Sequence, residues 1–72
     1  MLERLKQLRI KSGLTCQQMA KQMGLTKATY YKKEQGQIKI SLFDAKKISN
    51  ILGHSIDNIF FSSDSRADDN ND

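Results

Sequence analysis

The segment from residue 24 to residue 36, GLTKATYYKKEQG, carries three lysines and two adjacent tyrosines but few apolar residues. Lysine ammonium groups attract anions and donate hydrogen bonds, and a tyrosine hydroxyl can donate or accept one. Local signals predict a short helix here, because Thr26 can cap its start and Gly36 can end it. A helix with so few apolar side chains cannot be buried all round. We therefore expect its outward face to be a binding surface.

Charge is unevenly distributed along the 72-residue chain. Residues 1–61 contain eleven Lys or Arg and four Asp or Glu, a formal charge of +7, whereas residues 62–72 contain four Asp and one Arg, a formal charge of −3. A small domain this basic attracts polyanions, nucleic acid first among them. The second segment has no apolar residue larger than Ala67, so we expect a disordered acidic tail. The tail either serves solubility alone or competes with phosphate for the basic face.

Composition argues against several classes of protein. The single cysteine, Cys16, cannot form a disulfide within the chain and suits a reducing compartment, the cytoplasm of a bacterial host. No apolar run approaches the roughly 20 residues that cross a bilayer, so we expect no membrane association. Cys16 has no CxxC partner, and His54 follows a glycine with no second histidine nearby, so we expect His54 to be exposed. We expect no metal site, no cofactor and no enzymatic activity.

Capping signals and glycines predict five short helices and no strand. Thr15 with Gln18, and Ser41 with Asp44, have the spacing of capping boxes that open helices. The expected helices span about residues 2–12, 16–23, 27–35, 42–52 and 56–61. Apolar residues at helical spacing predict which faces are buried. These inward stripes are Leu2, Leu5 and Leu8; Met19, Ala20 and Met23; and Leu42, Ala45, Ile48 and Leu52.

The second and third helices are joined by a turn of only three residues, which starts at Gly24. Such a turn needs a residue that tolerates positive φ, and glycine does so without steric cost. Ala20 is small enough to let the next helix cross close by, and Leu25 and Tyr30 can fill the angle between the two. This is the geometry of a helix-turn-helix, whose second helix is offered to the DNA major groove.

From about residue 2 to residue 60 the chain resembles the Cro/CI-type (XRE) helix-turn-helix family of phage and bacterial regulators. The resemblance implies an all-α, compact five-helix, lambda-repressor-like DNA-binding domain over residues 1–61, followed by the acidic tail. The matching positions are Arg9, Gly13-Leu14-Thr15, Met19-Ala20, Gly24-Leu25-Thr26, Glu34-Gln35-Gly36, Ser41-Leu42, Ala45, Ile48, Leu52-Gly53, Ser55-Ile56 and Ile59-Phe60.

The resemblance implies a double-stranded DNA operator as the ligand, with the helix over residues 27–35 in the major groove. Lysine can donate to guanine, alanine can touch a thymine methyl group, and tyrosine can hydrogen-bond or pack on a sugar. Residues of the preceding helix and of the loop after Gly36 are placed for phosphates, which fix register without reading sequence. The implied DNA-binding residues are Gln17, Gln18, Lys21, Thr26, Lys27, Ala28, Tyr31, Lys32, Gln37 and Lys39.

The resemblance also implies a partly buried ion pair between Arg9 and Glu34, which would hold the first and third helices together. Family members usually dimerise, so that two recognition helices meet successive major-groove faces about 34 Å apart. We expect a homodimer through the fourth and fifth helices. The candidate residues for this or another partner surface are Ile38, Ile40, Ile51, Phe60 and Phe61.

Three features depart from the family pattern. Cys16 stands where glutamine is common, and the loop after Gly36 contains Ile38 and Ile40 where polar residues are usual. Lys33 stands where an apolar residue packs inward; we expect its stem to lie on the core and its ammonium to reach solvent, at some cost in stability. Exposed isoleucines grouped together would mark a partner surface.

Two functions from different classes fit these observations. The first is a sequence-specific regulator without a ligand domain, a Cro-like repressor of a phage or mobile-element genetic switch. The second is an antirepressor, or modulator of repression, that pairs with a partner repressor and acts on DNA poorly or not at all. Salt-dependent DNA binding would support the first, and a heterocomplex with a neighbouring repressor the second.

Overall fold

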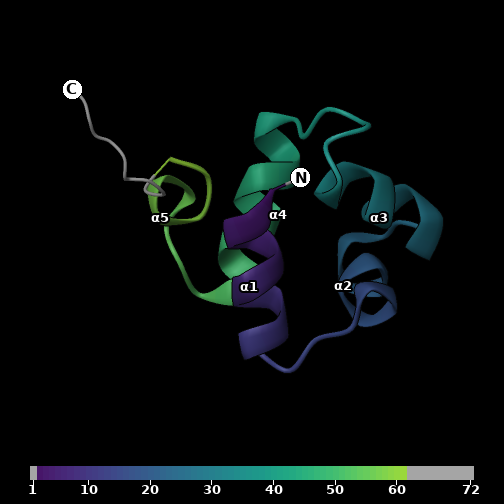
Figure 1. Cartoon of the computed structure of the whole chain (residues 1–72), viewed down its shortest axis with the longest axis horizontal. Coiled ribbons are helices and arrows are strands. Elements are labelled where there is room, and N and C mark those ends of the chain that lie inside the picture. Colours follow the sequence, from purple (N-terminus) through teal and green to yellow (C-terminus); the bar gives the residue numbers. More distant parts are fainter. Residues whose placement is uncertain (1, 62–72) are drawn as a thin grey trace.

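The computed structural model describes residues 2–61, which fold into five α-helices (Figure 1). The acidic tail predicted over residues 62–72 lies outside the described part, and its disorder stays a prediction. No strand occurs among the described residues, so the all-α prediction is confirmed. The helices are α1 (Glu3–Lys11), α2 (Cys16–Met23), α3 (Lys27–Glu34), α4 (Leu42–Leu52) and α5 (Ile56–Phe60).

Side-chain caps set the starts of α2, α3, α4 and α5 where the sequence predicts them. At α2, Thr15 Oγ1 accepts a hydrogen bond from the Gln18 backbone N–H at 3.0 Å, and Gln18 Oε1 accepts one from the Thr15 N–H at 2.9 Å. Ser41 and Asp44 form the same reciprocal pair at the start of α4, with distances of 3.0 and 3.1 Å. Both capping boxes are therefore confirmed. The single-residue caps are Thr26 for α3 and Ser55 for α5.

The turn between α2 and α3 is made at Gly24, whose φ of +73° confirms the predicted left-handed conformation. The next residue, Leu25, donates its backbone N–H to the Ala20 carbonyl at 2.9 Å, which satisfies one of the last carbonyls of α2. Ala20 is 1% exposed and has only a methyl group, so it does not hold the two helices apart. The sequence thus dictates a short, tightly closed turn.

All five helices contribute to one core. Figure 1 shows α2 and α3 as a pair on one side and α5 on the opposite side, with α1 and α4 between them. Tyr30 of α3 and Met19 of α2 are both 0% exposed in this core, and Leu25 of the turn between the two helices packs against it. The buried hydrophobic residues are Leu5, Leu8, Met19, Ala20, Met23, Tyr30, Ala45, Ile48, Leu52 and Ile59.

Leu42 does not join this core, contrary to the predicted stripe of α4. Its side chain is 67% exposed, whereas Ala45, Ile48 and Leu52 are buried. The cause is angular: at 3.6 residues per turn, Leu42 lies roughly 90° from the centre of the stripe formed by the other three. It is also the first residue of the helix. Leu42 therefore projects from the edge of the buried face into solvent.

Candidate nucleic-acid interface

Helix α3 turns one face into the core and the other toward solvent. Tyr30 is 0% and Glu34 is 1% exposed, and these two residues are one turn apart on the inner face. Tyr31, which follows Tyr30, points the other way and is 48% exposed. The lysines Lys27 and Lys32 are also exposed. Helix α3 therefore has one buried face and one exposed face, and the exposed face carries lysine and tyrosine side chains.

Glu34 and Arg9 form a buried ion pair at the junction of α1 and α3. Arg9 Nε donates to Glu34 Oε2 at 2.8 Å, and Arg9 Nη2 donates to Glu34 Oε1 at 3.1 Å. Arg9 Nη1 donates to the Leu14 carbonyl at 2.7 Å, and the Tyr30 hydroxyl donates to Glu34 Oε2 at 2.6 Å. Both charged groups are thus paired and hydrogen-bonded, which limits the free-energy cost of burying them. The cluster ties α3 to α1 and to the loop between α1 and α2.

These contacts shift two pKa values. The hydrogen bond to Glu34 raises the pKa of Arg9 even though burial opposes the charge. Burial, together with the hydrogen bond to Glu34, raises the pKa of Tyr30 well above its ordinary value, so the hydroxyl stays a donor. Cys16 Sγ lies 4.0 Å from Glu34 Oε1, so the thiol is directed at this cluster. At position 16, where glutamine is common in the family, this chain thus has a cysteine whose side chain faces the interior.

All ten residues implied as DNA contacts are exposed, and they come from three consecutive pieces of the chain: α2, α3 with its cap, and the loop after Gly36. Two of them also cap helices. Gln18 uses its Oε1 in the capping box of α2, and Thr26 Oγ1 accepts the Thr29 N–H at 3.2 Å. The Thr26 hydroxyl also donates to Thr29 Oγ1 at 3.0 Å, so toward a ligand it can only accept, whereas the side-chain NH₂ of Gln18 can donate. The ten are Gln17, Gln18, Lys21, Thr26, Lys27, Ala28, Tyr31, Lys32, Gln37 and Lys39.

The exposed surface of α2 and α3 is free of negative charge. Helix α2 contains no acidic residue, and the single acid of α3, Glu34, is buried against Arg9. Within residues 2–61 no ion pair engages Lys21, Lys27 or Lys32. Excess positive charge therefore gathers on this surface, since the chain places its acids in internal pairs or on other helices.

Lys33 does not send its ammonium into solvent, contrary to expectation. Its Nζ donates to Asp44 Oδ2 at 2.7 Å and to the Lys39 carbonyl at 3.3 Å, and its side chain is only 13% exposed. The reason is that the α3–α4 loop brings Asp44, the capping-box acid of α4, beside the last turn of α3. Lys33 thereby fastens the loop that carries Gln37 and Lys39.

The pKa of Asp44 reflects this pairing. Burial by itself raises the pKa, but hydrogen bonds from Lys33 and from Ser41 outweigh it, so the folded-state pKa is lowered. A lowered carboxyl pKa adds stability above the unfolded-state pKa of about 4, and this stability is lost as pH falls through the folded-state value.

We expect Asp44→Asn to lower the free energy of unfolding by about 1–3 kcal/mol at neutral pH, because the largely buried Lys33 ammonium loses its counter-charge. The difference from wild type should shrink as pH falls from 5 to below the folded-state pKa, where the wild-type carboxyl is itself protonated. Urea unfolding followed by circular dichroism across this pH range measures it. A difference that is independent of pH would contradict the role of the ion pair.

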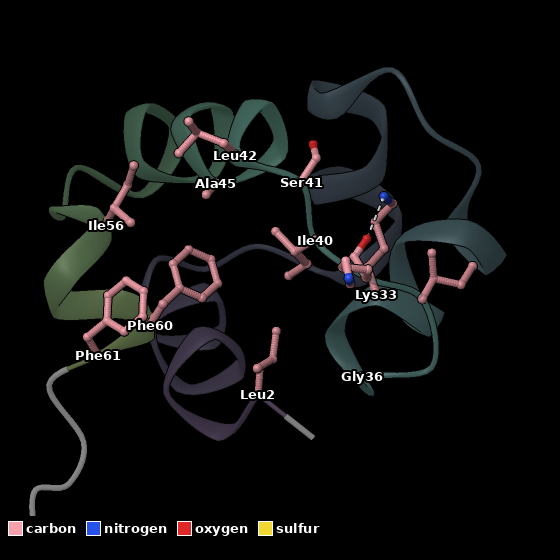
Figure 2. Close-up of a pocket in the computed structure, with 12 residues that line it drawn as sticks. Leu2, Lys33, Gly36, Ile40, Ser41, Leu42, Ala45, Ile56, Phe60 and Phe61 are labelled. Carbon is pink, nitrogen blue, oxygen red and sulfur yellow. Dashed lines mark hydrogen bonds between the residues drawn. The ribbon is translucent and has the colours of Figure 1, made fainter.

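Four of the five residues expected at a partner surface line one apolar groove: Ile38, Ile40, Phe60 and Phe61. Figure 2 shows Phe60 and Phe61 on the α5 side of this groove and Ile40 on the side of the α3–α4 loop. The fifth, Ile51, does not line the groove; it is half-buried and packs against the core. Leu42 lines the groove as well and was not expected there, because its helical spacing had pointed to the core.

His54 was predicted to be exposed, but its side chain is half-buried. Its Nδ1 lies 2.8 Å from Asn58 Nδ2, while Asn58 Oδ1 accepts a hydrogen bond from Arg4 Nη2 at 3.0 Å. Arginine can only donate, so the Asn58 amide group faces His54 and donates to its ring. His54 thus helps to orient Asn58, whose Oδ1 accepts the hydrogen bond from Arg4 of α1.

Comparison with known sequences bears directly on this geometry. The sequence model of a helix-turn-helix family, of the XRE type, matches residues 5–59, which include all of α2, the turn at Gly24 and α3. The chain belongs to the Cro/CI-type (XRE) helix-turn-helix family. No curated protein and no solved structure matches it.

Membership of the XRE family confirms both the resemblance and the five-helix fold. The family is one of DNA-binding regulators, so the chain is a DNA-binding regulator of the XRE type. Among residues 2–61, no helix has the length and apolar character of a membrane span. In this helix-turn-helix, α3 is positioned by α2 and by the turn at Gly24. The Arg9–Glu34 ion pair holds the buried face of α3 against α1.

Proposed function

We propose that this chain is a Cro-like repressor that binds a double-stranded DNA operator with α3 in the major groove. The observation that supports the proposal most strongly is the outer surface of α2 and α3, where Lys21, Lys27 and Lys32 are exposed and no acid is. Such a surface suits a polyanion, and α3 projects from it with Tyr31 at 48% exposure.

We assign the candidate contacts to two roles. Residues of α3 and its cap would meet base edges and the sugars beside them, as lysine, threonine, alanine and tyrosine side chains can. Residues of α2 and of the α3–α4 loop would meet phosphates and set the register of the protein on DNA. The first group is Thr26, Lys27, Ala28, Tyr31 and Lys32, and the second is Gln17, Gln18, Lys21, Gln37 and Lys39.

We further propose a homodimer, since two copies of α3 must reach major-groove faces one helical turn apart, about 34 Å. The apolar groove beside α4 and α5 is its candidate surface. The setting we propose, the cytoplasm of a bacterial host and the genetic switch of a phage or mobile element, rests on the Cro/CI resemblance alone.

The proposal is tested by measuring binding to DNA from the protein's own genetic neighbourhood at a series of salt concentrations. The two exposed lysines assigned to phosphates, Lys21 and Lys39, each releasing a counterion, give an expected slope of log K against log[salt] of about −2 per protomer. A specific site should bind more tightly than unrelated DNA at every salt concentration. A slope near zero on all sequences would contradict DNA binding by this surface.

A second function, antirepression, is supported by the same apolar groove. Ile38, Leu42 and Phe61 are 38%, 67% and 75% exposed there, which is unusual for large apolar side chains grouped together. In that function the groove would bind a partner repressor. The test is a pull-down with any repressor that the neighbouring genes encode. A heterocomplex that is lost in Phe61→Ala supports antirepression, and failure to form any heterocomplex argues against it.

A further inference from the structure

The first half of the loop between α3 and α4 is held by the backbone of α3. The Gln37 N–H donates to the Lys32 carbonyl at 2.8 Å, and the N–H groups of Gly36 and Ile38 also donate to carbonyls in the last turn of α3. These hydrogen bonds use backbone groups alone, so they depend on no side chain of the loop. Gln37 therefore keeps its place relative to α3 for as long as α3 is folded.

The second half of the loop lacks this support. Within residues 2–61, no backbone–backbone hydrogen bond engages Lys39 or Ile40. The Ile40 side chain packs against the core, but apolar contacts are not directional and do not fix the orientation of the peptide group between the two residues. In the part of the chain that the structure describes, this peptide group makes one hydrogen bond: its carbonyl, that of Lys39, accepts from Lys33 Nζ at 3.3 Å (dashed line in Figure 2).

The Lys33 ammonium is itself fixed by a short ion pair. Its Nζ lies 2.7 Å from Asp44 Oδ2, and the two side chains are only 13% and 15% exposed. Asp44 is in turn held by its capping box, in which Oδ2 also accepts the Ser41 N–H at 3.1 Å. Lys33 therefore connects the last turn of α3, the Lys39 carbonyl and the start of α4. Because the pair is largely buried, salt screens it much less than it screens an exposed pair.

We propose that Lys33 is a positioning residue for DNA binding, which fixes the backbone from which the exposed Lys39 reaches a phosphate. A side chain on a fixed backbone loses less conformational entropy on binding than one on a mobile backbone. Lys33 needs no contact with DNA for this role, since its charge is already paired with Asp44. This inference rests on the proposed function, because it specifies how one of the phosphate contacts assigned there is placed.

A charge-neutral variant of the full chain, Lys33→Met with Asp44→Asn, removes the link. It deletes one positive and one negative charge, so the net charge and the long-range attraction for DNA are unchanged. Methionine has an unbranched stem like that of lysine, and an asparagine Oδ1 can still accept the Ser41 N–H, so α4 keeps its cap. No uncompensated charge stays buried, and circular dichroism should show a folded chain.

The affinity for one duplex is then measured with and without Lys39→Ala, in the wild type and in the charge-neutral variant. In the wild type, Lys39→Ala should weaken binding several-fold and make the slope of log K against log[salt] less negative by about 0.9. In the charge-neutral variant the loss should be smaller, so that the two affinity ratios differ by about 2-fold or more, as for other coupled residues. An equal loss in both chains would overturn the inference.

Gln37→Ala is the matched control, because the backbone of α3 holds Gln37 whether or not Lys33 is present. Its effect on affinity should be the same in the wild type and in the charge-neutral variant. If both loop variants lose their effect together, the ion pair holds the whole loop, and the specific placement of Lys39 is contradicted.

A second measurement needs no DNA. NMR relaxation gives the order parameter of the Ile40 N–H, which belongs to the same peptide group as the Lys39 carbonyl. In the charge-neutral variant this value should fall from about 0.85, typical of rigid backbone, towards about 0.6, while that of Gln37 stays near the rigid value. An unchanged value at Ile40 would overturn the inference. A wild-type chain that binds no DNA, together with the expected loss of order at Ile40, contradicts the proposed function and not the role of Lys33 in fixing the loop.

Discussion

Replacing Glu34 with Gln is expected to lower the free energy of unfolding by about 3–5 kcal/mol, because it leaves the Arg9 guanidinium, 6% exposed, without a counter-charge. The same change deprives the Tyr30 hydroxyl of an anionic acceptor at 2.6 Å. Small domains have free energies of unfolding of only about 5–15 kcal/mol, so a loss of this size threatens the whole fold. Urea unfolding followed by circular dichroism measures the effect.

The control for this prediction is Glu3→Gln, which neutralises an exposed acid in the first turn of α1 and should change the free energy of unfolding by no more than about 0.5 kcal/mol. A double variant, Arg9→Met with Glu34→Leu, removes both buried charges and should be more stable than Glu34→Gln alone. If Glu34→Gln unfolds at the same urea concentration as Glu3→Gln, the buried pair does not hold α1 and α3 together.

Replacing Lys27 or Lys32 with Ala is expected to weaken binding to the preferred DNA sequence by about 1–3 kcal/mol for each lysine that meets a base edge. Both side chains are exposed on α3 and neither is used in an ion pair among the described residues. The free energy of unfolding should change little, since neither side chain packs in the core. Fluorescence anisotropy against the preferred and an unrelated sequence separates loss of specificity from loss of charge.

Lys46→Ala provides the matched control for the lysine variants, because it removes the same charge from an exposed position on α4. It should reduce affinity for both DNA sequences slightly and by the same factor. If Lys46→Ala costs as much affinity for the preferred sequence as Lys32→Ala, α3 has no special role in recognition.

Much of the fold could be predicted from the sequence because the signals that set it are local. A capping threonine and a glutamine three residues on specify the start of α2 wherever they occur. Gly24 similarly specifies a left-handed turn without reference to the rest of the molecule. The site on α3 was predictable for a related reason: the alternation of buried Tyr30 with exposed Tyr31 follows from helix geometry once the helix is located.

What could not be predicted depends on how the elements pack. Lys33 meets Asp44 only because the irregular α3–α4 loop folds back beside α3, and neither periodicity nor a capping signal describes that loop. The exposure of Leu42, by contrast, follows from its angle of roughly 90° to the other three residues of the α4 stripe, which the residue spacing already contains. The sequence predicts several exposed apolar residues but not that they form one groove, since the walls of the groove come from segments far apart in the chain.

The central claim is that the exposed surface of α2, α3 and the loop after Gly36 binds DNA. The most direct test compares the salt dependence of DNA binding for the wild type and for the double variant Lys21→Ala with Lys39→Ala, the two lysines assigned to phosphates, on the same duplex. We predict that the slope of log K against log[salt] becomes less negative by about 2 per protomer, since each phosphate contact contributes about 0.9. An unchanged slope in a folded variant would mean that DNA lies on another surface, and would contradict the claim.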